Sequence, residues 1–556
     1  MIGDELSQLL EGAIEEAQKS GDLPQFSIPE VTVEHPREAA HGDYATPVCL
    51  QMAHLARLAP MKIAQILLRH LLQTDFIGQV EVAHPGFINF TLSSQWLASQ
   101  VEAILTAGES WGDLGLGKGR KAQVEFVSAN PTGPLTVGRT WGAVLGDTIA
   151  NILTAVGYDV TREYYFNNAG HQMRLLGESV RARYLELLGR PAELPEEGYQ
   201  GDYIWDIAQG ILDKESDSLL EAGWEPFKER AEAWVFQNIN ATLDRFGVHF
   251  DVFYNENSLY ESGRVNQVNH ELMASHYAYE KDGAIWFRAQ HFGAEKDRVL
   301  VKSTGEPTYR LPDIAYHVHK LQRGFDLIVD IFGADHHATW PDVVAGVRAL
   351  GYDTSGIKVI IHQFISLIKD GQPVKMSTRR GDFVTLDRLL DMVTTESIPG
   401  KDVVRFMLLT RSPDRSMVFD LDLAVQQSDE NPVYYVQYAH ARIASILRFA
   451  EGRGISSGGG NVALLAHPSE LALIRQMLLL PEVVEQAALD LAPHRLTYYA
   501  QELASAFHAF YRDCRVVSSD PRDAELTRAR LKLARAAKVV LARTLALMGM
   551  TAPQQM

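Results

Sequence analysis

The sequence predicts an α/β Rossmann-type catalytic domain with a helical insertion, preceded by a small α+β domain and followed by an all-α helical bundle. Three observations lead to this fold class. The chain has 556 residues, which is more than a single domain usually holds. Apolar strands alternate with helical stretches in its middle, as is typical of a parallel sheet. After about residue 400, only the 3.6-residue period of helices remains. The expected domains are residues 1–115, 116–400 and 401–556.

The first 115 residues combine both kinds of secondary structure. Residues 52–72 have helical periodicity interrupted at Pro60, and residues 80–92 alternate as strands around a Pro-Gly turn. A further helix is expected over residues 96–105, before a glycine-rich link. This pattern predicts a module in which helices pack against a small sheet.

The middle domain alternates strands and helices. A short apolar strand is followed by a Pro/Gly-rich loop, a helix over residues 142–156 and a second strand, which together start a parallel sheet. Residues 170–290 are mostly helical and charged, and they are expected to be an insertion. The strands of the sheet are expected at residues 122–126, 160–166, 326–332 and 358–362.

The last domain shows helical periodicity throughout, which predicts a helical bundle. A flexible Ser-Gly-Gly-Gly loop at residues 457–460 separates two of its helices. The helices are expected at residues 402–410, 432–449, 470–487, 494–511 and 525–548.

Composition excludes several classes of protein. The formal net charge of −18 argues against a strongly basic nucleic-acid coat, although a local basic face is compatible with it. The two cysteines, Cys49 and Cys514, cannot build a disulfide framework or a four-cysteine zinc site. His317 and His319 stand two residues apart, on different faces of a helix, so no metal site is expected. No apolar run is long enough to cross a membrane, and the opening residues do not resemble a signal peptide, so we expect a cytoplasmic protein.

The turn after the first strand of the parallel sheet is the first candidate site. Nucleotides and small substrates bind in such sheets where a strand leads to a helix N-terminus. This turn carries Glu125, Ser128 and Asn130 before a tight Pro-Thr-Gly-Pro sequence. Because Glu125 ends an apolar strand, its charge is expected to face a cleft. A rigid structural turn is the alternative interpretation.

Two basic segments are further candidates. Residues 375–381 (KMSTRRG) follow the last apolar strand, and such basic and hydroxyl residues suit closure of a loop over a polyphosphate. Residues 512–543 carry an excess of five positive charges, and Arg528, Lys532 and Arg535 recur there at helical spacing. A stripe of this kind suits the phosphate backbone of a nucleic acid. A solvated loop and an ordinary charged helix are the alternatives.

Segments along the whole chain resemble the arginyl-tRNA synthetases, a family of class I aminoacyl-tRNA synthetases. They occur in the family's order and read HGDYAT, SANPTGPL, GAVLGD, REYYFNNAGHQ, SLYESG, TYRLPDIAYH, FGADHH, VKMSTRRGDFVTLDRLL, NPVYYVQYAHARI, AFHAFYRDCRV and a terminal APQQM. The resemblance implies that arginine and ATP form arginyl-adenylate and pyrophosphate, and that arginine is then transferred to the 3′ end of tRNA(Arg). It implies an N-terminal domain at the tRNA elbow and a bundle at the anticodon. ATP is a substrate, Mg²⁺ is expected with it, no organic cofactor is implied, and we expect a monomer.

The resemblance also implies roles for particular residues. Those expected to bind arginine are Glu125, Ser128, Asn130, Gln172, Tyr309 and Asp313. Those expected to bind ATP are Gly138, Gly142, His336, Lys375 and Met376. Those expected at the chemical step are Lys121, Thr136, Gly138, Arg139, Lys375, Ser377 and Arg379. Those expected to contact tRNA are Tyr434, Gln437, Tyr438, His440, Arg442, Tyr511, Arg515, Arg528, Lys532 and Arg535.

The chain departs from the family at its signature. Where the motif HxGH is expected, residues 136–139 read Thr-Val-Gly-Arg, so both histidines are absent. Loss of one preorganised donor lowers a rate by about 10²–10³-fold. Thr136 can still donate a hydrogen bond, and Arg139 is a permanent cation whose fork suits phosphate. Thr378 stands where a second lysine is common, and Lys121, Lys118 or Arg379 is expected to replace it.

Two functions are therefore compatible with the sequence. In the first, Arg139 and Thr136 act in place of the signature histidines and the chain is an active arginyl-tRNA synthetase. In the second, it is a catalytically impaired relative that binds tRNA or arginine. A nucleotidyltransferase with another acceptor is a more distant third, which the two flanking domains argue against.

Overall fold

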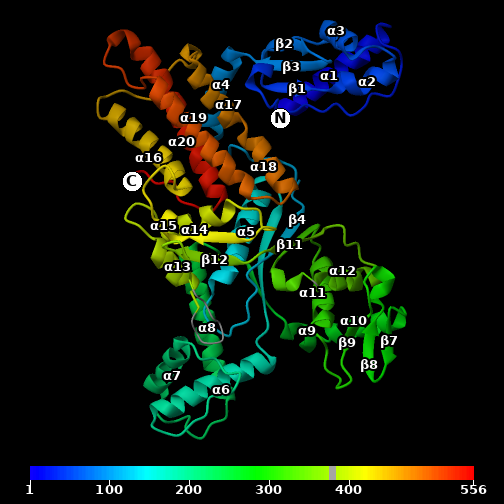
Figure 1. Ribbon diagram of the computed structural model, residues 1–556, viewed down its shortest axis with the longest axis vertical. Coiled ribbons are helices and arrows are strands. Elements are labelled where there is room, and N and C mark those ends of the chain that lie inside the picture. The colour runs from blue at the N-terminus through cyan, green and yellow to red at the C-terminus, as the bar shows by residue number, and fades with distance from the viewer. Residues whose placement is uncertain (338, 375–382) are drawn as a thin grey trace.

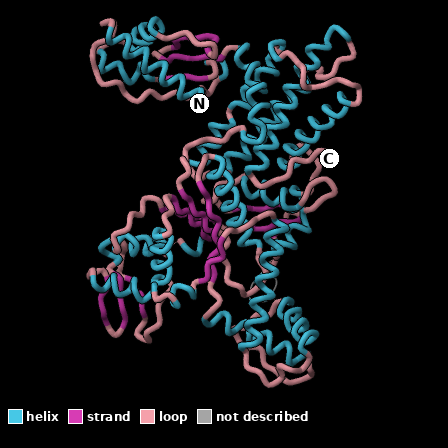
Figure 2. Tube along the Cα trace, turned by 180° about the vertical axis from the view of Figure 1, so that it is seen from behind, coloured by secondary structure: helices cyan, strands magenta, loops and turns pink. Residues whose placement is uncertain are grey.

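The computed structural model describes residues 1–337, 339–374 and 383–556, and the molecule is elongated (Figure 1). A small N-terminal domain and a C-terminal helical bundle lie toward one end, and a central parallel sheet with its surrounding helices lies toward the other. Seen from behind, the strands of the sheet run together below the bundle (Figure 2). The predicted fold class is confirmed.

The N-terminal domain packs three helices on a small antiparallel sheet of strand order β1-β3-β2. The apolar face of the first helix explains this packing, since Leu6, Leu10 and Ile14 lie on one side and are buried. The elements are α1 (Ile2–Lys19), β1 (Tyr44–Thr46), α2 (Val48–Ala56), α3 (Pro60–His70), β2 (Ile77–Ala83) and β3 (Phe87–Leu92).

The central sheet has five parallel strands in the order β11-β10-β4-β5-β6. Its first helix approaches β4 closely, because a Cβ atom on Gly146 would lie 2.1 Å from the ring of Phe126. The strands are β4 (Lys121–Glu125), β5 (Asp159–Phe166), β6 (Val252–Asn255), β10 (Leu327–Gly333) and β11 (Ile357–His362). The connecting helices are α5 (Val137–Ala155), α11 (Arg310–Gln322) and α12 (Trp340–Ala349). The four predicted strands are confirmed, and α5 begins at Val137 rather than at residue 142.

The stretch 170–290 differs from the single helical insertion that we expected. Three helices leave the sheet after β5, and the chain then returns to form β6, which pairs with β5. A second excursion carries two helices and an antiparallel sheet of order β7-β8-β9. These short strands lack a long apolar run, so helical periodicity masked them. The elements are α6 (Gly170–Leu187), α7 (Asp202–Glu215), α8 (Glu225–Phe246), α9 (Asn257–Glu261), α10 (Arg264–Ala274), β7 (Ala278–Lys281), β8 (Ala284–Phe287) and β9 (Arg298–Val301).

A small sheet follows the central one, in the order β13-β12-β14. Its last strand lies beyond residue 400, where we expected helices alone; β14 pairs in parallel with β12, about fifty positions earlier in sequence, and its four residues are too few to show a period. The elements are β12 (Ile365–Lys369), β13 (Gln372–Pro373), α13 (Leu386–Val393), α14 (Gly400–Leu409), β14 (Met417–Asp420) and α15 (Leu421–Ala424).

The C-terminal domain is a helical bundle, as predicted. The helix expected over residues 470–487 is interrupted at Leu479, and Pro481 occupies the first turn of the next helix, where its missing N–H costs no hydrogen bond. The helices are α16 (Pro432–Glu451), α17 (Pro468–Leu478), α18 (Leu480–Leu489), α19 (His494–Asp513) and α20 (Ala524–Leu547). The short 3₁₀ turns of the chain are η1 (Ala39–His41), η2 (Gly108–Ser110), η3 (Ala289–Phe292), η4 (Ala334–His336), η6 (Val462–Leu464) and η7 (Pro521–Asp523).

The helix expected at the end of the N-terminal domain packs on the bundle. This helix, α4 (Ser94–Ala107), lies against α17 and α20 and buries Leu97, Val101 and Ile104. Trp111 after it donates a hydrogen bond of 3.1 Å to the carbonyl oxygen of Met477. Within the residues described, no helix is long and apolar enough to cross a membrane.

Arg405 of α14 joins several helices at one buried point. Its guanidinium is fully buried and contacts Asp147 of α5 at 2.8 Å. It also donates to the carbonyl oxygens of Phe246 and Gly247 at the end of α8, and to that of Met548 at the end of α20. Cations favour helix C-termini because the last carbonyls lack partners. Arg405 therefore fixes the bundle and the first excursion against the central helix α5.

Arg405→Met is expected to lower the free energy of unfolding by about 3–5 kcal/mol, because the buried Asp147 carboxylate loses its partner at 2.8 Å and keeps only Arg162, at 3.5 Å. The shift is measured as the denaturant midpoint of intrinsic fluorescence. Arg512→Met is the control, since that arginine is exposed at the end of α19. Equal midpoints for the two variants would contradict this account of Arg405.

Candidate active site

A cavity of about 650 Å³ opens at the carboxyl ends of the parallel strands. This is the edge of an open α/β sheet where ligands bind, and the volume suits a small molecule. Its wall combines the end of β4, the residues after β5 and β6, the start of α11 and the turn after β10. Segments far apart in the sequence therefore meet around one cavity.

One side of the cavity is acidic and has no basic partner. Asp313, in the first turn of α11, and Glu256, directly after β6, both line it. Among the residues described, neither carboxylate forms an ion pair; Glu256 accepts a hydrogen bond of 2.8 Å from the hydroxyl of Tyr165. Burial raises the pKa of Asp313 to about 7, with Glu256 and Glu125 adding to the shift. Burial also raises the pKa of Glu256. Two such carboxylates favour a cationic ligand.

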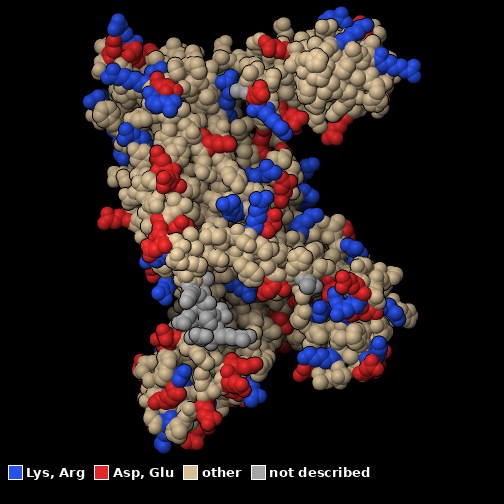
Figure 3. Space-filling view, viewed as in Figure 1, with Lys and Arg blue, Asp and Glu red and all other residues tan. Residues whose placement is uncertain are grey.

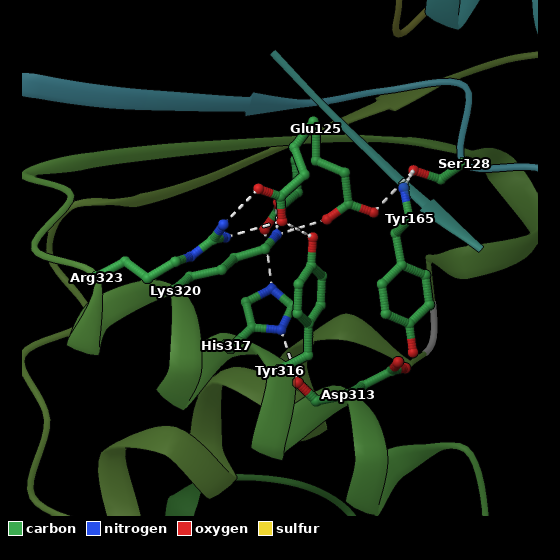
Figure 4. Close-up of polar contacts among 10 residues, drawn as sticks. Glu125, Ser128, Tyr165, Asp313, Tyr316, His317, Lys320 and Arg323 are labelled. Carbon is green, nitrogen blue, oxygen red and sulfur yellow. Dashed lines mark hydrogen bonds and ion pairs between the residues drawn. The ribbon is translucent and has the colours of Figure 1, made fainter. Parts of the chain in front are cut away.

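Glu125 is held at the base of this cavity by the strained turn that follows β4. Val127 and Ser128 have φ of 66° and 39°, in the left-handed region that side chains other than glycine rarely adopt. This turn lets the Ser128 hydroxyl donate to Glu125 at 2.9 Å while it accepts from the Tyr165 amide at 3.2 Å. Ser128 thus orients Glu125 and links β4 to β5 (Figure 4).

Below the cavity lies a buried polar cluster that the sequence did not reveal (Figure 4). The ammonium of Lys320 on α11 contacts Glu125 and Asp330, both at 2.5 Å. His317 donates to Asp330 at 2.9 Å. Although burial opposes ionisation, Lys320 and His317 hold the pKa of Asp330 below its ordinary value. The cluster joins α11 to β4 and β10.

The other residues expected to bind arginine lie at the rim. Asn130 lines the cavity; its side chain donates to Gln172 at 3.0 Å and accepts from the amide of Asn167. Gln172 lies behind Asn130 and does not line the cavity. Tyr309 lines the opening and is 54% exposed, with Arg310 above its ring.

The N-terminus of α5 forms the opposite, cationic side. Thr136 is the N-cap of α5, Gly138 is exposed in its first turn, and Arg139 lines the cavity. Among the residues described, the Arg139 guanidinium has no hydrogen bond or ion pair with another side chain. A helix N-terminus with a free cation suits an anionic group.

The residues that follow the segment expected at the phosphates adjoin this helix. Lys375, Met376, Ser377 and Arg379 lie outside the described residues. The chain that follows them is joined to the start of α5, because the amide of Val137 donates to Val384 at 3.1 Å and that of Leu386 donates to Leu135 at 2.8 Å. Two segments separated by about 250 positions therefore adjoin at the cationic side.

His336 lines the cavity beside Phe332, with their rings 5.1 Å apart. Gly142 lies under His362, because a Cβ atom there would be 3.2 Å from Nε2 of that ring. Burial, together with nearby Arg139, lowers the pKa of His362. A neutral, buried ring thus covers the second turn of α5.

Lys121 is not brought to the cavity. It is the first residue of β4, and its amide is bound to Asp326 before β10. A strand rises about 3.3 Å per residue, so Lys121 lies about 13 Å from the end of β4 where the cavity opens. The structure does not support a catalytic role for this lysine.

Several residues expected to contact tRNA gather at a second cavity, of about 490 Å³, on the bundle. Arg442, Tyr511 and Arg515 line it, and Arg442 donates to the Tyr511 hydroxyl at 2.7 Å. Tyr434 and Tyr438 stack nearby on α16, with ring centroids 5.7 Å apart. Partly exposed aromatic rings beside arginines suit unpaired bases.

Three residues of the expected tRNA surface are instead engaged inside the protein. Gln437 is fully buried and bonded to Asp402, and His440 is 1% exposed and bonded to the carbonyl of Pro553. Lys532 pairs with Glu102 of α4. Helical spacing cannot distinguish a face turned to solvent from one covered by another segment. Of the expected positive stripe, Arg535 is exposed and Arg528 pairs with Glu525.

Four residues at or below the cavity were not expected from the sequence, namely Tyr165, Asn167, Glu256 and Lys320. Glu256 follows a strand that we took for part of a helical insertion. Lys320 lies seven residues after Asp313, and this spacing, with Tyr316 and His317 between them, puts all four on one helix face. This spacing is the sequence feature from which the position of Lys320 beside the site could have been predicted. No group of three or more His, Cys, Asp or Glu side chains among the described residues could hold a metal.

Charge on the face shown in Figure 3 is mixed, with Lys and Arg interspersed among Asp and Glu. The net charge of −18 is thus not gathered into one acidic surface on that face. Local basic groups such as Arg442 and Arg515 remain compatible with an anionic partner.

Three family models match consecutive parts of the chain. They are described as "Arginyl tRNA synthetase N terminal domain" for residues 4–92, "tRNA synthetases class I (R), catalytic domain" for residues 100–401 and "DALR anticodon binding domain" for residues 436–556. The catalytic model alone spans more than half of the chain.

Curated proteins match over the whole length. The arginine–tRNA ligase of Desulfotalea psychrophila is 48% identical over 561 residues, which cover 100% of both chains. That of Salinibacter ruber is 46% identical over 557 residues, which cover 96% of this chain and 97% of the other. The solved structure of Thermus thermophilus arginyl-tRNA synthetase shares the fold, with a TM-score of 0.76 at 23% identity over 100% of both chains.

Proposed function

The chain belongs to the arginyl-tRNA synthetase family, and from this premise we propose that it activates L-arginine with ATP and transfers it to the 3′ end of tRNA(Arg). Its activity is that of an arginine–tRNA ligase. The proposal is carried by one structural observation. Asp313 and Glu256 face the same cavity as Arg139, and none of the three forms an ion pair with another described residue. A cation and a polyphosphate can thus occupy the two sides of the same cavity.

The acidic side is proposed to bind the arginine side chain. A guanidinium presents five donors in a planar fork, which carboxylates accept in pairs. Asp313 and Glu256 supply the charge, with Glu125 behind them and Tyr165 and Asn130 completing the polar wall. A lysine ammonium would leave acceptors unmatched, so the site favours arginine.

The cationic side is proposed to bind ATP. In the first step a carboxylate oxygen of arginine attacks the α-phosphorus, and the bond to pyrophosphate breaks. Negative charge builds on the α-phosphate oxygens as this happens. Arg139, which lines the cavity, and Thr136, the N-cap of α5, are proposed to donate hydrogen bonds to these oxygens. Lys375 and Ser377 are proposed to contact the leaving phosphates. Mg²⁺ is expected to arrive with ATP, since it prefers substrate phosphates to all-protein cages.

The bundle is proposed to receive the anticodon loop at the cavity lined by Arg442, Tyr511 and Arg515. A base can stack on an aromatic ring there while the arginines hold phosphates. The N-terminal domain is proposed to reach the tRNA elbow. A monomer in the cytoplasm remains our prediction from the sequence.

The proposal is tested by transfer of labelled arginine to a tRNA(Arg) transcript in the presence of ATP and Mg²⁺. Charging with arginine is expected to be at least about a hundredfold more efficient than charging with lysine, because a site built for hydrogen bonds rejects ligands that leave them unpaired. Absence of charging with any amino acid would contradict the proposal and favour an impaired relative that only binds tRNA or arginine. The full-length match to arginine–tRNA ligases does not favour that alternative.

Arg442→Ala combined with Arg515→Ala is expected to raise the KM for tRNA about tenfold or more, since base stacking and cation contacts contribute about 1–3 kcal/mol per base. The KM for arginine, measured in the same charging assay, is expected to stay constant. Arg522→Ala is the matched control, because this arginine is exposed in the same basic segment and pairs with Asp520. An equal effect of the control would contradict the anticodon assignment.

A further inference from the structure

Lys320 is the most buried cation near the arginine site, and it does not line the cavity. Its side chain has no exposed surface. Lys320 is in the last turn of α11, on the helix face that carries Asp313 in the first turn. Its ammonium contacts Glu125 of β4 and Asp330 of β10, each at 2.5 Å. It also lies 4.4 Å from the centre of the Tyr316 ring. A lysine is almost never fully buried without such partners.

The charges of this cluster depend on the lysine. Although burial disfavours the charged ammonium, Asp330 and Glu125 hold the pKa of Lys320 above its ordinary value. Glu125 accepts from Lys320 through one oxygen and from the Ser128 hydroxyl through the other, so both its oxygens are oriented (Figure 4). Without the ammonium, the buried carboxylates of Glu125 and Asp330 would lose the cation that lies between them, and two like charges at such a distance repel each other.

A second ion pair on the same helix serves as a contrast. Arg323 is the C-cap of α11, three residues after Lys320. Its guanidinium contacts both oxygens of Glu163 on β5, at 2.6 and 2.8 Å. Tyr316 also donates to Glu163, at 2.5 Å. This pair ties α11 to the sheet as Lys320 does, but neither of its members lines the cavity. Loss of Arg323 therefore affects packing of the helix without unpairing Glu125.

We propose that Lys320 is a positioning residue for arginine binding, which acts through Glu125 by pairing with that carboxylate and directing it at the cavity. The proposal rests on the proposed function, because it concerns the same arginine site. Lys320 itself touches no substrate. The titratable groups that face Glu125 around it are Glu163 and Tyr165 of β5, Asp330 of β10, and Asp313, Tyr316 and Lys320 of α11.

Lys320→Met is expected to raise the KM for arginine about tenfold or more at pH 7.5, because Glu125 loses the buried partner that directs it at the cavity. The KM for ATP is expected to change less than about threefold. Arg323→Met is the matched control, and it should lower the melting temperature while leaving the KM for arginine within about threefold. Equal effects of the two variants on the arginine KM would overturn the proposal, because Lys320 would then be a structural residue only.

The pH profile separates a positioning role from a structural one. In wild type the KM for arginine is expected to level off above about pH 7.5, because the pKa of Asp313 is raised to about 7. In Lys320→Met it should continue to fall up to pH 8.5, because Lys320 lowers the pKa of Asp313 and this carboxyl ionises later when the ammonium is gone. A profile parallel to that of wild type would count against the proposal.

A double-mutant cycle covers the case in which Lys320→Met does not fold. Glu125→Gln with Lys320→Met removes both charges of one ion pair, which is milder than leaving one buried charge alone. If Lys320 acts through Glu125, this double variant and Glu125→Gln share the same arginine KM. A further tenfold rise in the double variant would overturn the proposal. Absence of charging in wild type would instead contradict the proposed function. Failure of the proposal on Lys320 and failure of the proposed function are therefore distinguishable.

Discussion

Arg139→Ala is expected to lower the rate of arginyl-adenylate formation about 10²–10³-fold, the loss that follows removal of one preorganised donor. Arg139 lines the cavity at the start of α5, and the guanidinium has no other partner among the described residues. Its charge is therefore available for the α-phosphate oxygens as they become more negative. The effect should fall on turnover, because the contact strengthens in the transition state rather than in the bound substrate.

Single-turnover formation of the adenylate measures this effect, with the dissociation constant for arginine as the internal comparison. Arg139→Lys is the matched variant, which keeps the charge and loses the fork, and an intermediate rate is expected from it. An unchanged rate in Arg139→Ala would show that another group replaces the signature histidines.

Asp313→Asn is expected to raise the KM for arginine about 10–100-fold, since a hydrogen bond to a charged group contributes about 1.5–3 kcal/mol. The carboxylate faces the cavity from the first turn of α11 and has no ion-pair partner among the described residues. The KM for ATP should stay within about threefold. Equal rises in the two KM values would indicate general damage to the site instead.

The same carboxylate predicts a pH dependence. Because burial raises the pKa of Asp313 to about 7, this side chain takes up a proton as the pH falls through neutrality. Only the ionised form pairs with a guanidinium, so the affinity for arginine is present above pH 7 and is lost below it. The KM for arginine measured from pH 6 to 8 should rise toward acid in wild type, and should be flat over this range in Asp313→Asn.

The fold and part of the site follow from rules that operate on the sequence. Glu125 ends the first strand of a parallel sheet, and ligands bind at the carboxyl edge of such sheets, so this turn could be predicted as a site. Asp313, about 190 positions later, was expected there only through the resemblance to the arginyl-tRNA synthetases. The long apolar strands β10 and β11 were identified for the same reason, since a buried parallel strand reads as a continuous apolar run.

The remainder depended on contacts that periodicity does not carry. Glu256 follows β6, a four-residue strand whose neighbours in sequence are helices, and nothing local distinguishes it from an insertion. The left-handed turn at Val127 and Ser128 is imposed by its surroundings, because neither residue type favours that conformation. His440 and Gln437 occupy helical positions that look exposed until the C-terminal tail covers them.

The central claim is that this chain is an active arginine–tRNA ligase despite its altered signature at Thr136 and Arg139. Arginine-dependent exchange between ATP and pyrophosphate, with and without tRNA(Arg), tests it most directly, because exchange reports the adenylate step alone. We predict exchange that requires arginine in wild type and that falls about 10²–10³-fold in Arg139→Ala. Tight binding of tRNA(Arg) with no exchange under either condition would contradict the claim.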